Sequence, residues 1–236
     1  MSRQKILVCV PTYNERESIS QLIKTLFSLQ IDDLEILIID DASPDGTAEI
    51  IQELQSSYTG LRLLKRHPPY GRGAAGREAF IYALKEGYDV AVEMDADFSH
   101  NPKSLPSILN ALKDADLAIG SRLVKGGSDS DRSPWRRFLT EIANLYARRI
   151  LRLSVRDANS GYRAWNKKAI TAIEPQTLQA RGPAIVHETL FRATRAGIAI
   201  REIPIDFIDR KSGKSKLNLW KLSNGYFWIL RLALFG

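Results

Sequence analysis

The stretch KILVCVPTYNE, residues 5–15, decides the fold. Its first half, Lys5–Val10, is a short apolar run that predicts a buried β-strand. Asn14 follows as the predicted N-cap of a helix, with Glu17 three residues later as its capping-box partner. One apolar stripe then runs along that helix through Ile19, Leu22, Ile23, Leu26 and Phe27. A strand that leads directly into a helix is the first unit of an α/β fold.

The alternation of strand and helix continues to residue 120. Further strands are predicted at Glu35–Ile39, Leu61–Lys65, Tyr88–Met94 and Leu117–Gly120. The helices between them are predicted at Thr47–Gln55, Ala74–Lys85 and Pro102–Lys113. Because strands that alternate with helices are joined by crossover connections, we expect a mostly parallel sheet flanked by helices.

The pattern changes after residue 121. A Gly/Ser/Asp-rich loop at Lys125–Ser133 precedes a long basic helix at Trp135–Leu153. Asp157–Gly161 is rich in turn residues, and a helix at His187–Ala196 leads into a strand at Ile198–Phe207. The regular rhythm of strand and helix therefore belongs to the first half of the chain.

The two halves of the chain also differ in charge. The 236 residues carry a formal net charge of +7, but residues 1–120 have a net charge of −6 and residues 121–236 one of +13. The acidic half suits a cation, whereas the basic half suits phosphates, lipid headgroups or nucleic acid. The only cysteine, Cys9, lies in an apolar run, which predicts a reduced core residue and a cytoplasmic protein.

Asp95 and Asp97 are the strongest candidates for chemistry, because they follow the apolar strand predicted at Tyr88–Met94. Residues i and i+2 of an extended segment point the same way, so the two carboxylates can converge. Hard oxygen ligands beside phosphate oxygens suit Mg²⁺ or Mn²⁺. The alternative is a solvated acidic turn, and the position at a strand end favours the metal site.

The segment after the second strand, Asp40–Thr47, carries further carboxylates. Asp40 and Asp41 could accept hydrogen bonds from a nucleobase or from ribose hydroxyls. The alternative is a turn and helix cap built by Ser43, Asp45 and Thr47, and Asp45 fits that alternative well. Tyr13 could stack on a base, or it could serve packing alone.

Residues 71–76, GRGAAG, match the glycine pattern of dinucleotide-binding proteins. We discount a nicotinamide or flavin site because these glycines follow the third predicted strand instead of the first. The alternative is a helix start that packs closely on the sheet and lends Arg72 or its backbone N–H groups to a phosphate.

Several motifs occur together in a fixed order. They are Pro11–Glu15, Asp40–Thr47, Glu93–Pro102, Gly120–Arg122, Asp157–Arg163 and Phe207–Lys216. Together they resemble the dolichol-phosphate mannosyltransferases, which are polyprenyl-phosphate glycosyltransferases of the large inverting glycosyltransferase family two. The resemblance covers nearly the whole chain, and the Phe-x-x-Arg-x-x-Gly-x-Ser-Lys run narrows it to polyprenyl-phosphate acceptors.

The resemblance implies a GT-A fold, a nucleotide-diphospho-sugar donor and inversion at the anomeric carbon. The residues that it assigns to the donor are Pro11, Tyr13, Glu15, Asp41 and Asp95. It assigns Mg²⁺ or Mn²⁺ to Asp95 and Asp97, with Ser99 or a water where some relatives have a Gln ligand.

The resemblance also implies a cationic acceptor side. It makes Asp97, Arg122, Arg137 and Arg210 the catalytic set and assigns the acceptor phosphate to Arg136, Ser212, Lys214 and Lys216. Many relatives have Asp-Pro-Thr-Ser-Gly where this chain has Asp157-Ala158-Asn159-Ser160-Gly161, so the chain departs from the family pattern in that loop.

We expect a catalytic domain over 1–216, with a nucleotide-sugar half (1–120) and an acceptor half (121–216). The remaining 217–236 is an apolar segment in which about ten nearly continuous apolar positions make half a membrane span at most. Its aromatic and basic residues favour a membrane surface, and the alternative is a terminal helix docked on the core.

The expected reaction is transfer of a hexose from a nucleotide sugar to a polyprenyl or dolichyl phosphate, with GDP-mannose favoured and UDP-glucose as the alternative. A sugar nucleotidyltransferase is a more distant alternative, because such enzymes more often carry a Gly-rich basic motif after the first strand. We expect a protein peripheral to the cytoplasmic face of a membrane. A separate membrane-spanning subunit is a further expected partner, and nucleic acid is not, because no binding module is recognisable.

Overall fold

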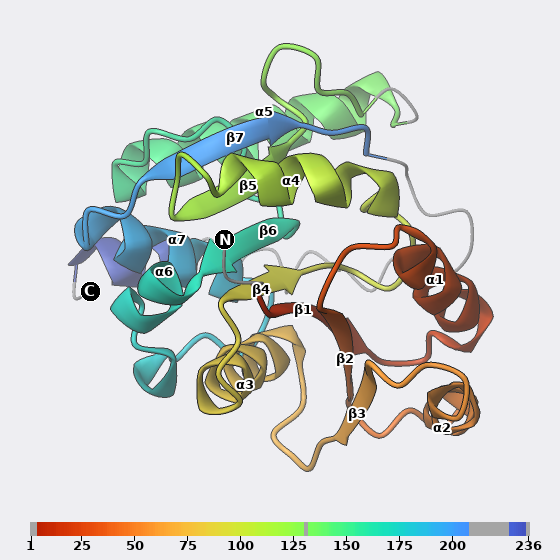
Figure 1. Cartoon of the computed structure of the whole chain (residues 1–236). Helices are drawn as coiled ribbons and strands as arrows, with labels where there is room; N and C mark the ends of the chain where they lie inside the picture. Colours follow the sequence, from red (N-terminus) through yellow and green to blue (C-terminus); the bar gives the residue numbers. More distant parts are fainter. Residues whose placement is uncertain (1–3, 130–131, 208–226, 235–236) are drawn as a thin grey trace.

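The computed structural model describes residues 4–129, 132–207 and 227–234 (Figure 1). Within these residues the sheet has seven strands: β1 (Ile6–Thr12), β2 (Leu34–Asp40), β3 (Leu61–Lys65), β4 (Val90–Glu93), β5 (Leu117–Ser121), β6 (Arg163–Asn166) and β7 (Ile200–Pro204). The α-helices are α1 (Arg16–Ser28), α2 (Thr47–Gln55), α3 (Arg72–Lys85), α4 (Leu105–Ala111), α5 (Pro134–Leu151), α6 (Lys167–Ala172) and α7 (Ile185–Arg195). Short 3-10 turns occur at Pro102–Ser104 and Pro175–Thr177, and residues 227–234 are also helical.

The strands lie in the order β3-β2-β1-β4-β6-β5-β7. Neighbouring strands are parallel except around β6, which is antiparallel to both β4 and β5. The predicted α/β fold with a mostly parallel sheet is therefore confirmed. The sequence did not predict β6, because its four residues, Arg163–Asn166, include a buried arginine and an asparagine and lack an apolar run.

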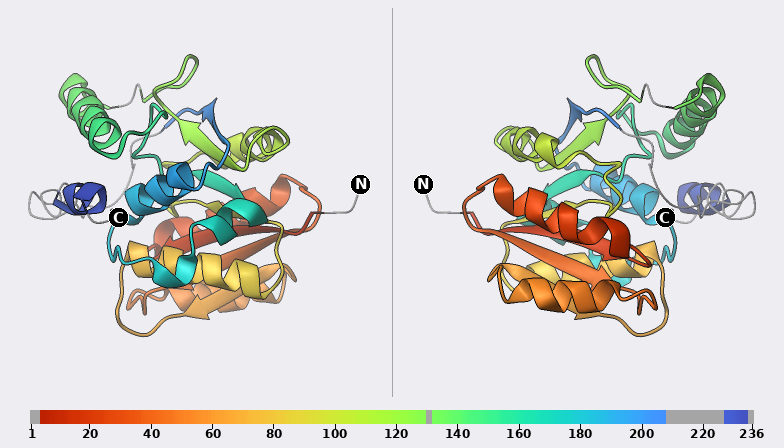
Figure 2. Two further views of the ribbon diagram at one scale, coloured as in Figure 1. Left: turned by 90° about the vertical axis from the view of Figure 1, so that its left-hand side faces the viewer. Right: turned by 90° about the vertical axis from the view of Figure 1, so that its right-hand side faces the viewer.

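The core has two layers, one on each face of the sheet (Figures 1 and 2). Along β1, Leu7 and Cys9 face one layer, whereas Ile6, Val8 and Val10 face the other. This period of two is the strand geometry expected of a doubly covered sheet. Helices α3, α5, α6 and α7 contribute to the first layer, and α1, α2 and α4 contribute to the second. The predicted burial of Cys9 is confirmed.

The start of α1 corrects the predicted capping box. Asn14 has a left-handed backbone with φ of 58°, the N-cap is Glu15, and no backbone N–H of α1 donates to the Glu15 side chain. The loop after β2 supplies acceptors instead. Glu15 N donates to Thr47 Oγ1 at 3.1 Å, and Arg16 N donates to Asp45 Oδ2 at 3.1 Å. The caps come from a distant segment because β1 and β2 end side by side.

Several element boundaries differ from the prediction. The strand predicted at 88–94 spans only Val90–Glu93. The helix predicted at 102–113 divides into a 3-10 turn and α4, which begins one residue before Pro106. Proline is tolerated only in the first turn of a helix, so regular helical bonding can begin there and not earlier. The predicted long basic helix is confirmed as α5, within two residues at its C-terminal end.

The terminal helix of residues 227–234 docks on the first core layer. Ile229 and Leu232 are buried in that layer, and Trp228 packs against it. The alternative of a docked terminal helix is thus correct for one face of the segment. The other face exposes Phe227 and Leu234. The predicted domain boundary at 216 lies outside the described residues, and among the described helices none is long and apolar enough to cross a bilayer.

Candidate active site

The candidate site lies where β1, β2 and β4 end. Strand β1 is parallel to β2 on one side and to β4 on the other, so their carboxyl ends meet at one edge of the sheet. A cavity of about 240 Å³ opens at this edge. It is lined by Asn14, Glu15, Arg16, Glu17, Ser18, Asp45 and Asp97. The structure therefore brings together Glu15 and Asp97, which were assigned to donor and metal.

Arg72, the first residue of α3, is directed at Asp95, one of the two aspartates that follow β4. Its Nη1 forms an ion pair with Asp95 Oδ1. Burial by itself lowers the pKa of Arg72, but Asp95 and Glu93 raise it above its ordinary value, so the guanidinium stays charged. Gly161 leaves room for this side chain, since a Cβ there would overlap the guanidinium. The glycine-rich helix start does pack closely, but Gly71 and Gly73 lie against the backbone of Ala180 and Arg181 instead of the predicted sheet.

Asp97 lies in the turn that follows β4. Its Oδ1 accepts a hydrogen bond from Ser99 N at 3.0 Å, and Phe98 between them has a left-handed φ of 61°. The two aspartates are thus held by a turn instead of an extended segment, with Asp95 facing Arg72 and Asp97 lining the cavity.

The carboxylates fit a divalent cation that completes its coordination with substrate. No group of three or more His, Cys, Asp or Glu side chains within 4–129, 132–207 and 227–234 could hold a metal ion. Mg²⁺ is commonly bound by one or two carboxylates together with substrate phosphates and water. Asp95 and Asp97 supply two carboxylates of this kind, and their assignment to the metal stays a prediction, as does the third ligand suggested at Ser99.

The two aspartates after β2 have different surroundings. Asp40 is fully buried and accepts hydrogen bonds from Thr12 Oγ1 at 2.9 Å and from Ser43 N at 2.9 Å, so it builds the turn. Asp41 forms an ion pair with Arg66 and accepts from Gly71 N at 2.7 Å. Its assignment to the donor stays a prediction, as do those of Pro11 and the half-exposed Tyr13.

His100 is a site residue that the sequence analysis missed. Its Nδ1 accepts a hydrogen bond from Asp95 N at 3.1 Å, and its Nε2 lies 3.9 Å from Asp95 Oδ2. Burial lowers the pKa of His100, which favours the neutral imidazole that this acceptor role requires. The ring also stacks on Tyr162 and meets Phe207 edge-on, so His100 connects the aspartate turn to the second half of the chain.

Arg122, which the resemblance assigned to the acceptor side, forms a bidentate ion pair. Its Nε and Nη2 donate to the two carboxylate oxygens of Asp157, each at 2.8 Å. Asp157 is fully buried, and Arg122 holds the pKa of its carboxyl below the ordinary value although burial acts in the opposite direction. The Arg122 guanidinium also lies 4.9 Å from the ring centre of Phe207. The loop 157–161, which departs from the family pattern, therefore orients this arginine through Asp157.

The other predicted acceptor residues fall in two groups. Arg136 and Arg137 lie exposed in the first turn of α5, where Ser133 Oγ accepts a hydrogen bond from Arg136 N at 3.4 Å. Outside the described residues lie Arg210, Ser212, Lys214 and Lys216.

Glu93 of β4 and Arg163 of β6 form a cluster of buried charged residues. Glu93 Oε2 accepts from Trp165 Nε1 at 3.0 Å, and burial raises the pKa of Glu93. Arg163 donates from Nη1 to Val186 O at 2.6 Å and from Nη2 to Ala158 O at 3.1 Å. The motifs Glu93–Pro102 and Asp157–Arg163 contain both charged residues, but the sequence could not predict that they meet, because the positions at which β4 and β6 pair are known only once the sheet is assembled.

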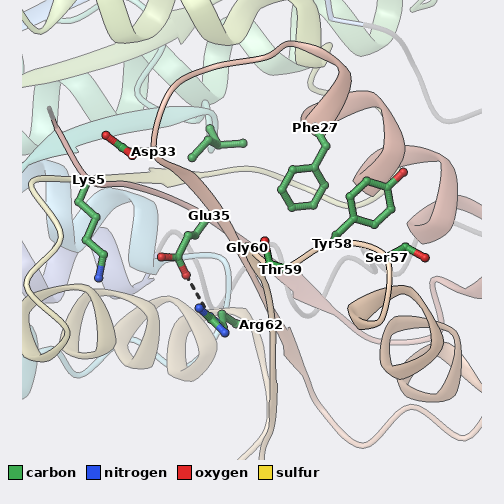
Figure 3. A pocket seen from close by; sticks show the side chains of 10 residues that line it. Lys5, Phe27, Asp33, Glu35, Ser57, Tyr58, Thr59, Gly60 and Arg62 are labelled. Carbon is green, nitrogen blue, oxygen red and sulfur yellow. Dashed lines mark hydrogen bonds and ion pairs between the residues drawn. The ribbon is translucent and has the colours of Figure 1, made fainter.

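A larger cavity, of about 680 Å³, lies at the opposite edge of the sheet (Figure 3). It is lined by residues around the starts of β1, β2 and β3, among them Lys5, Leu34 and Gly60. Its polar contact is the ion pair of Glu35 and Arg62 at 3.0 Å. None of the predicted site residues lines it, so we place the chemistry at the smaller cavity, where the strand-end carboxylates lie.

Comparison with known proteins agrees with the geometry. The sequence model of "Glycosyl transferase family 2" matches residues 7–173. The chain is 37% identical to the undecaprenyl-phosphate mannosyltransferase of Micrococcus luteus, covering 91% of this chain and 88% of that protein. It is 36% identical to the polyprenol monophosphomannose synthase of Mycolicibacterium smegmatis, covering 99% and 88%. It is also 35% identical to the dolichol-phosphate mannosyltransferase of Pyrococcus furiosus, covering 90% and 59%.

Solved structures are similar in fold. Glucosyl-3-phosphoglycerate synthase from Mycobacterium tuberculosis, in complex with Mn²⁺, UDP and glucosyl-3-phosphoglycerate, matches with a TM-score of 0.69 at 20% identity. The match covers 99% of this chain and 79% of that one. A second complex of the same enzyme contains Mg²⁺ and UDP and matches with a TM-score of 0.68 at 19% identity, covering 99% and 79%. The chain therefore belongs to glycosyl transferase family 2, and it is a glycosyltransferase with a GT-A fold.

Proposed function

We propose that this enzyme transfers a mannosyl group, with inversion, from a nucleotide-diphospho-sugar to a polyprenyl phosphate, and that the donor is GDP-mannose. The observation that carries the proposal is the identity of 35–37% over at least 90% of the chain to three enzymes whose names combine mannose with a polyprenyl phosphate. The strand-end carboxylates and the basic second half support the same reaction.

The donor would bind at the edge where β1, β2 and β4 end. Glu15 and Asp97 line the cavity there, and Asp95 is held by Arg72 and His100. Mg²⁺ or Mn²⁺ held by Asp95 and Asp97 would supply neutralisation of the negative charge on the departing diphosphate. Related folds solved with Mn²⁺ or Mg²⁺ and UDP support a divalent ion in this role.

The acceptor phosphate needs no general base. A phosphate monoester has a second pKa of about 6 and is mostly dianionic at neutral pH. Its oxygen attacks the anomeric carbon, the bond from that carbon to the diphosphate oxygen breaks, and no proton has to move. The residues that this proposal assigns to binding and orienting the two phosphate groups are Arg122, Arg136, Arg137, Arg210, Ser212, Lys214 and Lys216. Arginine suits this role because its planar fork binds phosphate oxygens in pairs.

The proposal includes work at a membrane surface. A polyprenyl phosphate is anchored in a bilayer by its lipid chain, so the enzyme would act as a peripheral protein, with the cytoplasmic face as the proposed side. A separate membrane-spanning subunit is a further proposed partner. The excess of basic residues in 121–236 supports contact with anionic headgroups.

Labelled donors provide the test. The protein is incubated with polyprenyl phosphate, Mg²⁺ and either labelled GDP-mannose or labelled UDP-glucose, and the lipid is extracted. We expect label in the lipid from GDP-mannose. Label from UDP-glucose alone would replace the donor by the alternative, and label from neither donor would contradict the proposed reaction.

A further inference from the structure

Asn159 lies in the loop 157–161, at one of the two positions where this chain departs from the family pattern. Its side-chain oxygen Oδ1 lies 2.8 Å from Nε2 of His187 in α7, and because an amide oxygen can only accept, Nε2 carries the hydrogen. The backbone N of Asn159 donates to Oδ1 of Asn144 in α5 at 3.2 Å. His187 and Asn144 are both buried, so Asn159 connects the loop to the inner sides of α5 and α7.

From Asn144 the contacts continue to the first turns of α5. Asn144 Nδ2 donates to Thr140 O at 3.0 Å, and Thr140 Oγ1 donates to Arg136 O at 2.9 Å. Thr140 Oγ1 also accepts a hydrogen bond at 3.1 Å from Nη1 of Arg132, which lies just before α5. The pair of asparagines is therefore connected to the part of α5 that carries Arg136 and Arg137, which the proposed function assigns to phosphate groups.

Along the loop, Asn159 is two residues from the partner of Arg122. Asp157 accepts hydrogen bonds from the Arg122 guanidinium and, at 3.2 Å, from Arg122 N. On the other side of Asn159, Ser160 Oγ donates to Gly120 O at 2.5 Å. Because a short loop that is bound on both sides of a residue cannot absorb a shift there, a displacement of Asn159 would move Asp157 and with it the Arg122 guanidinium.

Arg122 and Arg132 meet on one aromatic ring. The guanidinium of Arg122 lies 4.9 Å from the ring centre of Phe207, and that of Arg132 lies 5.2 Å from it. The contacts therefore form a closed series, which runs from Arg122 through Asp157 and Asn159 to α5 and returns from Arg132 to Phe207. Such a series fixes the place of Arg122 relative to the start of α5.

Stability alone is a poor explanation for His187 at this place. The ring is buried, and within the residues that the structure describes its Nδ1 has no hydrogen-bond partner. A buried polar atom without a partner costs free energy, so an apolar side chain would stabilise the protein at least as well. An apolar side chain could not supply the directional hydrogen bond that fixes the Asn159 side chain.

We propose that Asn159 is a positioning residue for the sugar transfer. Held by Asn144 and His187, it keeps Arg122 at the distance from the start of α5 at which both can bind phosphate oxygens of the substrates. Asn159 acts through Arg122 in this role and touches no substrate. The inference deepens the proposed function, on which it rests, by naming a residue that aligns the arginines of the second half of the chain.

Acceptor kinetics test the role of Asn159. In Asn159→Ala the kcat/KM for polyprenyl phosphate should fall by about 10- to 100-fold, because misplaced phosphate-binding groups lose much of the benefit of orientation. The affinity for GDP should match that of the wild type. The control Ile51→Ala truncates a buried side chain of α2, so it should lower stability and leave the acceptor kcat/KM unchanged. Equal acceptor kcat/KM values for the two variants would overturn the proposal.

Further variants distinguish positioning from a general loss of stability. His187→Gln keeps an N–H donor for Asn159, so it should retain most of the activity that His187→Ala loses. In an Arg122→Lys background, Asn159→Ala should cause little further loss, because the group that Asn159 positions has already been changed. Losses that multiply as they do for independent sites, or equal activities of the two His187 variants, would contradict the role.

Hydrogen exchange separates this inference from the proposed function. The backbone N–H of Arg122 donates to Asp157, so its exchange rate reports the position of the loop without any substrate. That rate should rise more in Asn159→Ala than in Ile51→Ala, and an unchanged rate in Asn159→Ala would overturn the inference. A faster rate, together with a wild type that transfers no sugar to polyprenyl phosphate, would contradict the proposed reaction and leave the coupling of Asn159 to Arg122 standing.

Discussion

At the scale of single residues, the candidate site is a balance of buried and half-buried charges. Arg72 pairs with Asp95, Arg122 pairs with Asp157, and His100 holds the backbone of Asp95. Each pair lowers the cost of keeping a charged group away from water. The two ion pairs thus fix the positions of these carboxylates and guanidiniums at the candidate site.

Replacement of Asp97 tests the metal edge. Asp97→Ala should lower kcat/KM by about 100-fold or more, because the leaving diphosphate loses electrostatic stabilisation. Its circular dichroism spectrum should match the wild type. The control Asp114→Ala removes an exposed aspartate that pairs with Arg201 and should leave turnover unchanged. Near-normal turnover of Asp97→Ala with Mg²⁺ would refute the assignment.

His187 makes stability depend on pH. Its Nε2 donates to Asn159 Oδ1 at 2.8 Å, and burial, with a smaller effect from Arg163, lowers its pKa to about 4. The unfolded chain has an ordinary histidine pKa of about 6.5, so it binds the proton first as the pH falls. This contribution to stability is complete above pH ~6.5 and decreases toward pH ~4, by about 3 kcal/mol in total.

Denaturant unfolding at pH 7 and pH 5 measures the effect of His187. The wild type should lose more stability between these values than His187→Gln, which has no titrating ring. An equal loss in both proteins would show that other groups cause the pH dependence.

At the scale of elements, the contacts between loops decide how helices begin. Helix α1 takes its caps from the loop after β2, and α3 begins against Ala180 and Arg181 through its glycines. Gly73 N donates to Arg181 O at 3.0 Å, which leaves no space for a side chain at residue 73. The position of Arg72 therefore depends on the neighbouring glycine.

Substitution of Gly73 tests this packing. A Cβ at residue 73 would overlap the carbonyl oxygen of Ala180, so Gly73→Ala should destabilise the protein by about 1–3 kcal/mol. It should also lower activity by shifting Arg72 from Asp95. Gly182→Ala is the matched control, because nothing lies within 4 Å of the added atom. Thermal unfolding of the two variants gives the comparison, and equal midpoints would refute the close approach.

At the scale of the whole molecule, the end of the chain packs on the core built by its first strands. Ile229 is 2% exposed and belongs to the same core layer as Leu7 and Trp165. The docked helix thereby fixes the exposed side of residues 227–234 relative to α5 (Figure 2). The acidic first half supplies the strand-end carboxylates, and the basic second half supplies α5.

Truncation of single side chains measures how firmly the terminal helix docks. Ile229→Ala should cost about 2–4 kcal/mol, since it opens a cavity in a buried layer. Leu230→Ala, at an exposed neighbouring position, should change stability by less than about 0.5 kcal/mol. Urea unfolding distinguishes the two variants. A small effect for both would mean that the helix does not contribute to the fold in solution.

The sequence by itself determined the α/β class, the first five strands, the strand-end carboxylates and the long basic helix. These features follow from apolar periodicity and from residue types that local geometry requires. Only the tertiary structure decided the caps of α1, the antiparallel β6, the buried Arg163 and the roles of Arg72 and His100 beside Asp95. The reason is physical. A local pattern records which face of an element is buried, whereas a hydrogen bond or an ion pair between distant segments depends on the place where the sheet brings them together.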